Sequence, residues 1–241
     1  MRIAICDDDR VTLDNLKSII LQELQINNFI CDEVDVFDSG YELLEEYSKK
    51  SYDAIFLDIR MPEISGFEIA AALREISFKT FIIFVTTENE LVFSSFDFQP
   101  FHFIRKYPSE YLKIQLKNVI KKLSRHIRQN ESIVLELAFS EKEKICVGDI
   151  LYISSEKNYL VYHFLKSEIR VRGKLAETAD KYSAYDFIRV HNCFLVNMKN
   201  IRFIDYPNDE IRLKDNSIIS IGRSYKKALN EQYTLYLRSL R

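Results

Sequence analysis

Short apolar runs alternate with amphipathic segments through the first half of the chain. The runs are Ile3–Cys6, Ala54–Leu57, Phe81–Val85 and Phe101–Ile104. The segments between them repeat apolar residues every three or four positions, which is typical of helices that pack one face. Runs without polar alternation are typical of parallel strands that are buried on both faces. The first half therefore predicts an α/β domain with a doubly wound parallel sheet.

The pattern changes after a polar stretch at Arg125–Ser132. Beyond it, strand-like runs follow one another, and several alternate apolar with polar residues as half-exposed antiparallel strands do. These runs are Ile133–Ala138, Lys144–Val147, Ile150–Ile153, Leu160–Phe164, Phe187–Val190, Phe194–Val196, Ile201–Tyr206, Glu210–Leu213 and Ile218–Ile221. Helical spacing returns near Lys174–Tyr182 and Ser224–Leu237. We predict an α/β domain over residues 1–123, a linker over 124–132 and a mostly β domain over 133–241.

The composition is that of a soluble globular protein with room for two domains. The chain has 241 residues, of which 47% are hydrophobic and 29% are charged. No apolar stretch approaches the roughly 18 to 20 residues of a membrane span, and no signal peptide precedes the first strand pattern. The four cysteines, Cys6, Cys31, Cys146 and Cys193, form no C-x-x-C pair, so we expect reduced thiols. These features predict a cytoplasmic protein without a membrane partner.

The charge is distributed unevenly between the two halves. Residues 1–123 carry a net charge of −7 and residues 124–241 carry +5, which together give the overall −2. An acidic half joined to a basic half suggests that the two halves have different partners. A chance imbalance of this size is also common, so the charge alone does not establish nucleic-acid binding.

Reactive side chains follow the apolar runs of the first half at the point where each run ends. Asp7 and Asp8 follow the first run, Asp58 the second, Thr86 the third and Lys106 the fourth. Because the carboxyl ends of parallel strands lie along one edge of a sheet, we expect these groups in one pocket. Carboxylates suit Mg²⁺, and phosphoryl transfer to a carboxylate needs positioning and charge neutralisation. Any one of these residues alone is more often a solvated loop residue, but the joint placement predicts a phosphorylation switch.

Residues 1–123 resemble the receiver domain of two-component response regulators, which has a flavodoxin-like fold. The resemblance rests on the following residues: the Asp7-Asp8 pair, Asp58 within Leu57-Asp58-Ile59-Arg60-Met61-Pro62, then Gly66, Thr86 and Lys106. It implies that Asp58 accepts a phosphoryl group from a sensor histidine kinase and that Lys106 and Thr86 assist the transfer. The expected partner of this half is therefore a sensor histidine kinase.

The same resemblance implies a Mg²⁺ cofactor and a pair of switch residues. Asp8, Asp58 and the backbone carbonyl of Arg60 would ligate the ion, and Asp7 would contribute through water. Thr86 and Phe103 would repack once Asp58 carries a phosphoryl group.

Two features depart from the pattern of the receiver family. The family usually places proline directly after its lysine, joined by a cis peptide, whereas Tyr107 follows Lys106 here and the proline is Pro108. The family also favours a small residue at the position of Thr87, and a larger side chain there can slow the entry of phosphodonor or water. We therefore expect a working site with atypical kinetics.

A phosphatase of the haloacid-dehalogenase type is a rival interpretation of the same acids. That family needs a second acid two residues beyond its nucleophilic aspartate, and Arg60 occupies this position after Asp58. We therefore do not expect an enzyme that acts on external substrates. The domain is expected to catalyse only its own phosphotransfer and dephosphorylation.

Residues 146–230 resemble the LytTR-type DNA-binding domain of the LytR/AlgR family. The segments that carry the resemblance are Val147–Ile153, Lys157–Tyr159, Val171–Leu175, Phe187–Asn197 and Ile221–Lys227. The family implies a mostly β fold that inserts loops, and no recognition helix, into successive major grooves of duplex DNA.

Three loops of this half carry side chains suited to reading DNA. Arg223 can bond guanine O6 and N7, Asn192 can bond a base edge or a phosphate, and Asn158 or Lys157 matches a third contact. The candidates for phosphate contacts are Lys199, Lys226, Lys227, Arg170 and Lys174. Each has a structural alternative: Asn192 can bond its own backbone, and the two adjacent lysines can simply solvate the first turn of the last helix.

These observations together predict a phosphorylation-dependent transcriptional regulator. Phosphorylated Asp58 would promote a homodimer through the helix near Glu88–Phe96, the last receiver strand and the helix from Ser109. Two basic domains would then occupy a direct repeat or paired half-sites on double-stranded DNA. The alternative is a signalling adaptor whose basic half binds a protein or an RNA.

Overall fold

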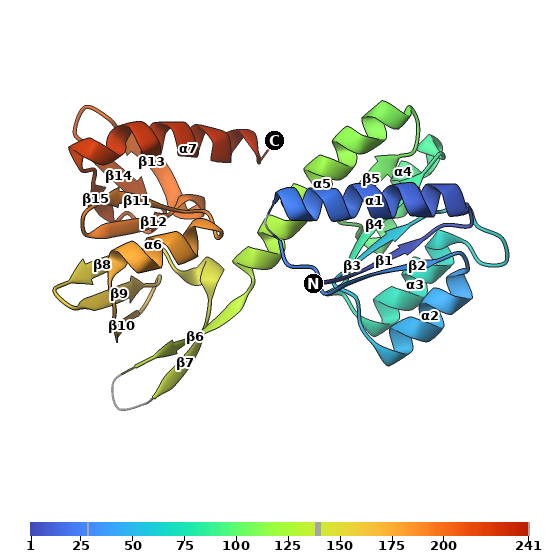
Figure 1. The fold of residues 1–241 in the computed structure, drawn as a ribbon, viewed down its shortest axis with the longest axis horizontal. Helices are drawn as coiled ribbons and strands as arrows, with labels where there is room; N and C mark the ends of the chain where they lie inside the picture. Colours follow the sequence, from blue (N-terminus) through green and yellow to red (C-terminus); the bar gives the residue numbers. More distant parts are fainter. Residues whose placement is uncertain (28, 138–140, 241) are drawn as a thin grey trace. The chain divides into compact units, whose positions relative to one another are not determined.

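The computed structural model describes residues 1–27, 29–137 and 141–240, and the chain divides into two compact units (Figure 1). The first unit is Met1–Ser124 and the second is Arg125–Arg241. Among the described residues, no helix is both long enough and apolar enough to cross a membrane.

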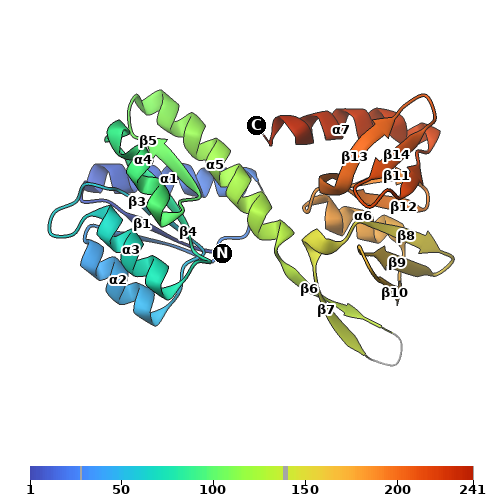
Figure 2. The ribbon, with the colours of Figure 1, turned by 180° about the vertical axis from the view of Figure 1, so that it is seen from behind.

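The first unit is a parallel sheet with helices on both faces (Figures 1 and 2). Its strands are β1 (Arg2–Cys6), β2 (Glu33–Phe37), β3 (Ala54–Leu57), β4 (Phe81–Thr86) and β5 (His102–Arg105), in the spatial order β2-β1-β3-β4-β5. Its helices are α1 (Arg10–Ile26), α2 (Gly40–Lys49), α3 (Gly66–Ile76), α4 (Val92–Ser95) and α5 (Ser109–Gln129). This strand order is the flavodoxin-like one, so the predicted fold class of the first half is confirmed.

Burial explains why the strands of the first unit lack polar alternation. All four residues of β3 are buried, as are the last four of β1 and the last five of β4. Both faces of these central strands are covered, so each position favours an apolar side chain. Polar side chains therefore appear only where these strands end.

The helix predicted near Glu88–Phe96 is wrong in its extent. The segment consists of the 3₁₀ turn η1 (Asn89–Leu91), the four-residue α4 and the 3₁₀ turn η2 (Phe96–Phe98). No side chain caps any of these pieces, and serine and aromatic residues have low helix propensity. Phe93 is 82% exposed and Phe96 is 62% exposed, so packing does not compensate for the weak propensity.

The second unit is mostly β, as predicted, and all its strand pairs are antiparallel. One sheet has the order β10-β9-β8-β12-β11, a second has β13-β14-β15 and a third has β6-β7. The strands are β6 (Ser132–Glu136), β7 (Lys142–Cys146), β8 (Tyr152–Glu156), β9 (Tyr159–His163), β10 (Glu168–Arg172), β11 (Phe187–His191), β12 (Phe194–Asn197), β13 (Ile201–Asp205), β14 (Glu210–Leu213) and β15 (Ile218–Ser220). The helical elements are η4 (Val147–Asp149), α6 (Leu175–Ser183), η5 (Met198–Asn200), η6 (Arg223–Tyr225) and α7 (Lys226–Arg238).

Two apolar cores hold the second unit together, one on each face of the five-stranded sheet. One core joins Ile153, Tyr162 and Leu195 of the sheet to Leu175 of α6. The other joins the sheet to β13, β14, β15 and α7. The strand β10 was not predicted because its Glu-Ile-Arg-Val-Arg sequence buries only two side chains and lies at the sheet edge. The strand predicted at Ile133–Ala138 is β6, and Ala138 lies outside the described residues.

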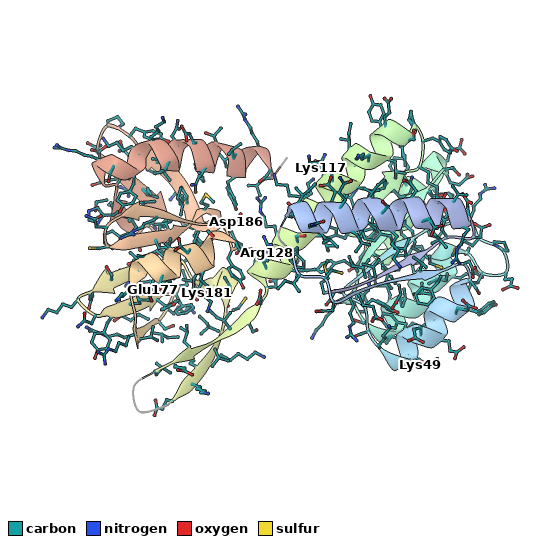
Figure 3. The ribbon with its side chains drawn as sticks, viewed as in Figure 1. Lys49, Lys117, Arg128, Glu177, Lys181 and Asp186 are labelled. Atoms are coloured by element: carbon teal, nitrogen blue, oxygen red, sulfur yellow. The ribbon has the colours of Figure 1, made fainter. Side chains whose placement is uncertain are left out.

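The last turns of α5 belong to the second unit and are bonded to it. Arg125 donates to Asp186 Oδ2 at 2.8 Å and to Ser239 Oγ at 2.6 Å. Arg128 donates to the carbonyl of Ala184 at 3.2 Å, and Figure 3 labels both Arg128 and Asp186. This part of the predicted 124–132 linker is therefore helical and packed.

Candidate functional site

Three acids gather at the carboxyl edge of the parallel sheet. Asp7 and Asp8 follow β1, and Asp58 follows β3, which pairs with β1 in the register Cys6↔Leu57. One oxygen from each acid lies within 4.8 Å of the others. Asp7 and Asp58 are buried while Asp8 is exposed, so the cluster opens to solvent on one side.

Lys106 bridges two of these acids. Its Nζ lies 2.6 Å from Asp58 Oδ2 and 2.7 Å from Asp7 Oδ2. Burial alone would lower the pKa of Lys106, but its hydrogen bonds to the two carboxylates outweigh burial and raise the pKa. Burial raises the pKa of Asp7, and Lys106 opposes that rise without cancelling it. The site therefore holds a charged lysine beside Asp7, whose ionised form is disfavoured by burial.

The backbone around Lys106 is also fixed at the sheet edge. The Lys106 N–H donates to the carbonyl of Thr86 at 2.9 Å, which continues the β4–β5 pairing by one residue. The cis peptide bond found in the described residues joins Tyr107 to Pro108, one position later than the family pattern.

The carboxylate of Asp58 is held by its own backbone surroundings. Its Oδ1 accepts from the Ile59 N–H at 2.7 Å, and its own N–H donates to Cys6 at 2.9 Å. The chain then turns back so that Gly66 donates to the Ile59 carbonyl at 2.9 Å. A Cβ at Gly66 would lie 2.0 Å from the Asp58 carbonyl oxygen, so only glycine fits this approach.

Thr86 lies at the end of β4 with its side chain fully buried. Its hydroxyl accepts from the Glu88 N–H at 3.2 Å, and as an acceptor it keeps its own hydrogen for another partner. The Glu88 carboxylate pairs with the Arg60 guanidinium at 3.1 Å. Phe103, the predicted aromatic switch residue, is half-buried and packs against the apolar core of the same unit. Thr86 thus links the acid site to the loop that begins at Glu88.

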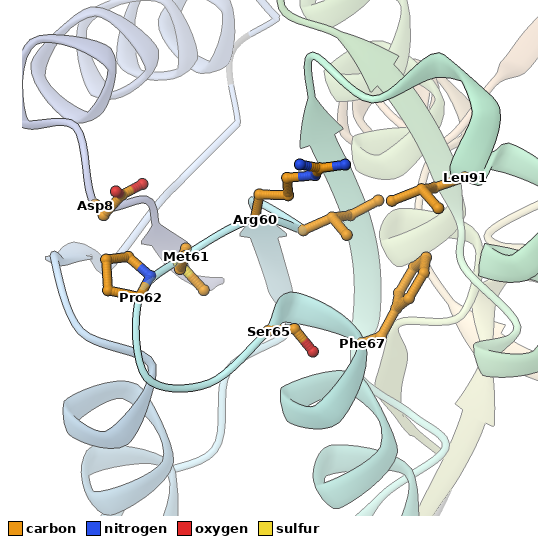
Figure 4. A pocket seen from close by; sticks show the side chains of 8 residues that line it. Asp8, Arg60, Met61, Pro62, Ser65, Phe67 and Leu91 are labelled. Atoms are coloured by element: carbon orange, nitrogen blue, oxygen red, sulfur yellow. The ribbon is translucent and has the colours of Figure 1, made fainter.

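A cavity of about 490 Å³ opens beside the acids (Figure 4). Its lining residues come from the loops after β1 and β3, from the first turn of α3 and from the segment after β4: Asp8, Ile59, Arg60, Met61, Pro62, Ser65, Phe67 and Leu91. The apolar members of this set were missed by the sequence analysis, because only the folded chain shows that Phe67 and Leu91 line the same cavity as Asp8.

The donor set fits a hard divalent cation. Three carboxylates whose oxygens lie within 4.8 Å of one another provide the oxygen ligands that Mg²⁺ prefers. The exposed side of the cluster, at Asp8, leaves room for the waters that this ion retains.

The second unit collects polar and basic residues at one end of its five-stranded sheet, here called the basic edge. The hairpin pairings Glu156↔Tyr159 and His191↔Phe194 place the turns at 157–158 and 192–193 at the same end, together with the end of β10. The contributing residues are Lys157, Asn158, Arg172, Lys174 and Asn192, all exposed. Arg172 was not among the candidates named from the sequence.

Arg223 joins the basic edge from the turn before α7. The Gly222 N–H donates to the Val190 carbonyl at 2.8 Å, and Tyr225 donates to Asn192 Oδ1 at 2.9 Å. The Arg223 side chain is exposed. The loops that carry Arg223 and Asn192 are therefore neighbours in the folded unit, although the two residues are about thirty positions apart in the sequence. The register of β11 with β12 places the Asn192 turn at this end of the sheet.

The other residues predicted to contact phosphates do not all lie at the basic edge, and several of them form ion pairs within the unit. Lys199 is exposed but follows the far end of β12, away from the basic edge. Arg170 pairs with Glu156 at 3.4 Å and lies 4.7 Å from the centre of the Tyr159 ring. The remaining ion pairs are Lys226 with Asp209 at 2.5 Å and Lys174 with Glu177 at 3.5 Å, while Lys227 is exposed.

Asn197 at the far end of β12 and His191 beside the basic edge make structural hydrogen bonds within the unit. Asn197 is buried, donates to the Ile150 carbonyl at 3.1 Å and accepts from Lys199 N–H at 3.1 Å. His191 Nδ1 accepts from the Cys193 N–H at 3.2 Å. Cys193 is a free, half-buried thiol.

Comparison with known proteins agrees with both halves of this description. Residues 3–113 match the response regulator receiver domain, and residues 140–234 match the LytTr DNA-binding domain. The sensory transduction protein LytT of Oceanobacillus iheyensis is 32% identical over 242 residues, covering 95% of this chain and 96% of its own. The chain belongs to the response regulators with a LytTR DNA-binding domain.

Further similarities of this response regulator extend over nearly its whole length or over one unit. The transcriptional regulatory protein YpdB of Escherichia coli K12 is 24% identical, covering 96% of this chain and 98% of its own. The crystal structure of the response regulatory domain of protein MrkE from Klebsiella pneumoniae is 27% identical, covers 52% of this chain and 97% of that chain, and has a TM-score of 0.47. The alignments with LytT and YpdB extend over both units of this chain.

Proposed function

We propose that this regulator is switched by phosphorylation of Asp58 and that the phosphorylated form binds DNA as a dimer. The observation that carries the proposal is the placement of Asp58 between Lys106 Nζ at 2.6 Å and the neighbouring acids Asp7 and Asp8. A nucleophile needs a fixed position and compensation for the charge that the phosphoryl group brings. This cluster supplies both.

The phosphotransfer step involves one bond made and one bond broken. An oxygen of Asp58 attacks phosphorus, the P–O bond forms, and the bond to the histidine nitrogen of the kinase breaks. Mg²⁺ held by Asp8, Asp58 and the Arg60 carbonyl, with Asp7 acting through water, would neutralise charge on the phosphoryl oxygens. The domain catalyses only this step and its own dephosphorylation.

The side chains of the site can then respond to the new phosphoryl group. Lys106, now bonded to Asp58 and Asp7, is within reach of a phosphoryl oxygen attached to Asp58. The Thr86 hydroxyl has a hydrogen to donate, and its movement would disturb the bond that it accepts from Glu88. The segment after Glu88 and the half-buried Phe103 would repack in consequence.

Labelling with an acyl phosphate tests the phosphoacceptor. We expect Asp58→Asn to abolish incorporation of phosphate, measured by radiolabel or by retardation in a phosphate-binding gel. Asp97→Asn is the matched control, because Asp97 is an exposed acid of the same unit in η2. Equal labelling of both variants would overturn the assignment of Asp58.

Dimerisation is supported by an exposed apolar surface after β4 and on α5. Phe93, Phe96, Tyr111 and Ile114 are all exposed large hydrophobic residues. A second copy of the chain would cover such residues once the segment has repacked. We expect sedimentation to show a monomer without beryllofluoride and a dimer with it, and an unchanged monomer would contradict the proposal.

DNA recognition is proposed to occur at the basic edge. The loops at 157–158, 192–193 and 222–225 present donors that can enter a major groove, and paired half-sites would engage the two copies of a dimer. Selection of duplexes from a random pool, with and without an acyl phosphate, should return one enriched motif. Enrichment of no motif, together with tight binding of a protein or an RNA, would favour the adaptor alternative.

A further inference from the structure

Asn192 and Tyr225 come from two loops that are joined in space. The Tyr225 hydroxyl donates to Asn192 Oδ1 at 2.9 Å. The backbones of the loops are joined as well, because the Gly222 N–H donates to the Val190 carbonyl at 2.8 Å. A Cβ at Gly222 would meet ring atoms of Tyr225 and His191 at 3.0 and 3.2 Å, so both rings lie close against this turn. The position of the Tyr225 ring is thus set by packing.

Arg189 supports the same arrangement from β11. Its guanidinium donates to the carbonyls of His191 at 3.3 Å and of Asn192 at 3.0 Å. It also lies 5.7 Å from the centre of the Tyr225 ring, which is within the range of a cation–π interaction. One cation therefore contacts both the ring of Tyr225 and the backbone that carries the Asn192 side chain.

The bond from Tyr225 makes the two ends of the Asn192 amide unequal. A side-chain amide offers an oxygen with two accepting lone pairs and an NH₂ group with two donors. The oxygen Oδ1 accepts from Tyr225, while Nδ2 of this exposed side chain has no hydrogen-bond partner among the described residues. A free asparagine reads adenine with both ends, accepting from N6 and donating to N7. In Asn192 the bond from Tyr225 occupies one lone pair of Oδ1 and fixes the direction of this oxygen, whereas both donors of Nδ2 are available.

We propose that Tyr225 is a positioning residue that sets the base preference of Asn192. The inference rests on the proposed DNA-binding function and deepens it. With Oδ1 turned toward Tyr225 and one of its lone pairs occupied, the available Nδ2 group of Asn192 matches the all-acceptor major-groove edge of guanine, N7 and O6, better than the mixed edge of adenine. The regulator then favours guanine over adenine at the base pair that Asn192 contacts, and removal of the Tyr225 hydroxyl restores the adenine-reading mode.

The test compares full-length variants in duplex selection and in binding to the selected duplex with guanine or adenine at each position. Tyr225→Phe removes the hydroxyl and keeps the ring that contacts Arg189. Tyr206→Phe is the matched control, because the Tyr206 hydroxyl makes the same type of bond, also 2.9 Å long, to Asn230 Oδ1 in the same unit. Asn192→Ala identifies the base pair that Asn192 reads.

We expect Tyr225→Phe to change the guanine-to-adenine preference at that base pair by roughly fivefold or more, within the range of one good base contact. The control Tyr206→Phe should leave the preference unchanged. In an Asn192→Ala background, Tyr225→Phe should have no further effect at the same base pair. A preference unchanged by Tyr225→Phe, or a shift that persists in the Asn192→Ala background, would overturn the positioning role.

The outcomes separate this inference from the proposed function. If the wild-type chain enriches no motif, the DNA-reading function and the inference both fail. If it enriches a motif that Asn192→Ala alters and Tyr225→Phe does not, only the inference fails. A measurement without DNA adds a second criterion: the Nδ2 resonances of Asn192, in protein labelled with ¹⁵N at asparagine, should shift in Tyr225→Phe and stay in place in Tyr206→Phe. Identical spectra of wild type and Tyr225→Phe would also overturn it.

Discussion

The two candidate sites of this regulator are built in opposite ways. In the first unit, Asp7, Asp58 and Lys106 stand at strand ends, are mostly buried, and are bonded to one another. In the second unit, Asn192 and Arg223 stand on exposed turns that are tied together by a few hydrogen bonds. A group that exchanges a phosphoryl must be positioned before the reaction, whereas a group that reads DNA must project from the surface. The first site is therefore rigid, whereas the side chains of the second site project into solvent.

The largest expected difference between the two sites concerns their glycines. A methyl group at Gly66 would lie 2.0 Å from the Asp58 carbonyl oxygen, and a backbone atom cannot move aside cheaply. We expect Gly66→Ala to lower the free energy of unfolding of the first unit by about 3 kcal/mol or more. In Gly222→Ala the new methyl group meets only ring atoms of Tyr225 and His191, so we expect a loss below about 1 kcal/mol in the second unit.

Hydrogen exchange followed by mass spectrometry on the full chain measures both units in one sample. Protection should fall across the strands of the first unit in Gly66→Ala and change little in Gly222→Ala. Similar losses in the two variants would show that the sites do not differ in rigidity.

The next largest effect is a difference in DNA affinity between substitutions at the two ends of the five-stranded sheet. Arg223 lies at the basic edge and Lys199 at the far end of β12, although both are exposed cations of the same unit. We expect Arg223→Ala to cost about 1–3 kcal/mol on the selected duplex and to relax one base preference. Lys199→Ala should cost less than about 0.5 kcal/mol. Fluorescence anisotropy at fixed salt measures both, and equal losses would remove the distinction between the two ends of the sheet.

The smallest effect is the dependence of stability on pH, which should have opposite signs in the two units. Burial raises the pKa of Asp7 above 3.8, so the unfolded chain loses that proton first. The contribution of Asp7 to the stability of the first unit therefore falls as pH rises from 3.8 through the folded pKa. Burial lowers the pKa of His163 below 6.5, so the unfolded chain takes up that proton first. The contribution of His163 to the second unit falls as pH drops below 6.5.

Paired variants isolate these two groups. Without divalent cations, Asp7→Asn should remove the first dependence and His163→Gln the second, as measured by denaturant unfolding at a series of pH values. A wild-type pH profile retained in both variants would assign the dependence to other groups.

The first site was predictable from sequence to a greater extent than the second. Strands buried on both faces leave a clear apolar pattern, and the residue after each strand must lie at one edge, which brings Asp58 near Asp8 and Lys106. No comparable rule places a turn residue on an antiparallel sheet. The position of Lys199 and the ion pair of Arg170 with Glu156 depend on register and on neighbours distant in sequence.

Local propensity explains the other differences between prediction and structure. The apolar residues around Phe93 and Phe96 suggest a buried helix, but both side chains are exposed and the helix is broken. The edge strand β10 carries three charged residues out of five, so its sequence has little apolar signal. The secondary structure of such exposed segments depends on the neighbouring elements in the fold, and these neighbours are not evident from the sequence.

The central claim is that phosphorylation of Asp58 controls the affinity of the second unit for DNA. The most direct test is the affinity of the full chain for the selected paired-site duplex, measured by anisotropy with Mg²⁺ and with or without beryllofluoride. We predict that the mimic tightens binding of the wild type by about 100-fold through dimer avidity and leaves Asp58→Asn unchanged. Equal affinity of the wild type in both conditions, or an equal response of Asp58→Asn, would contradict the account.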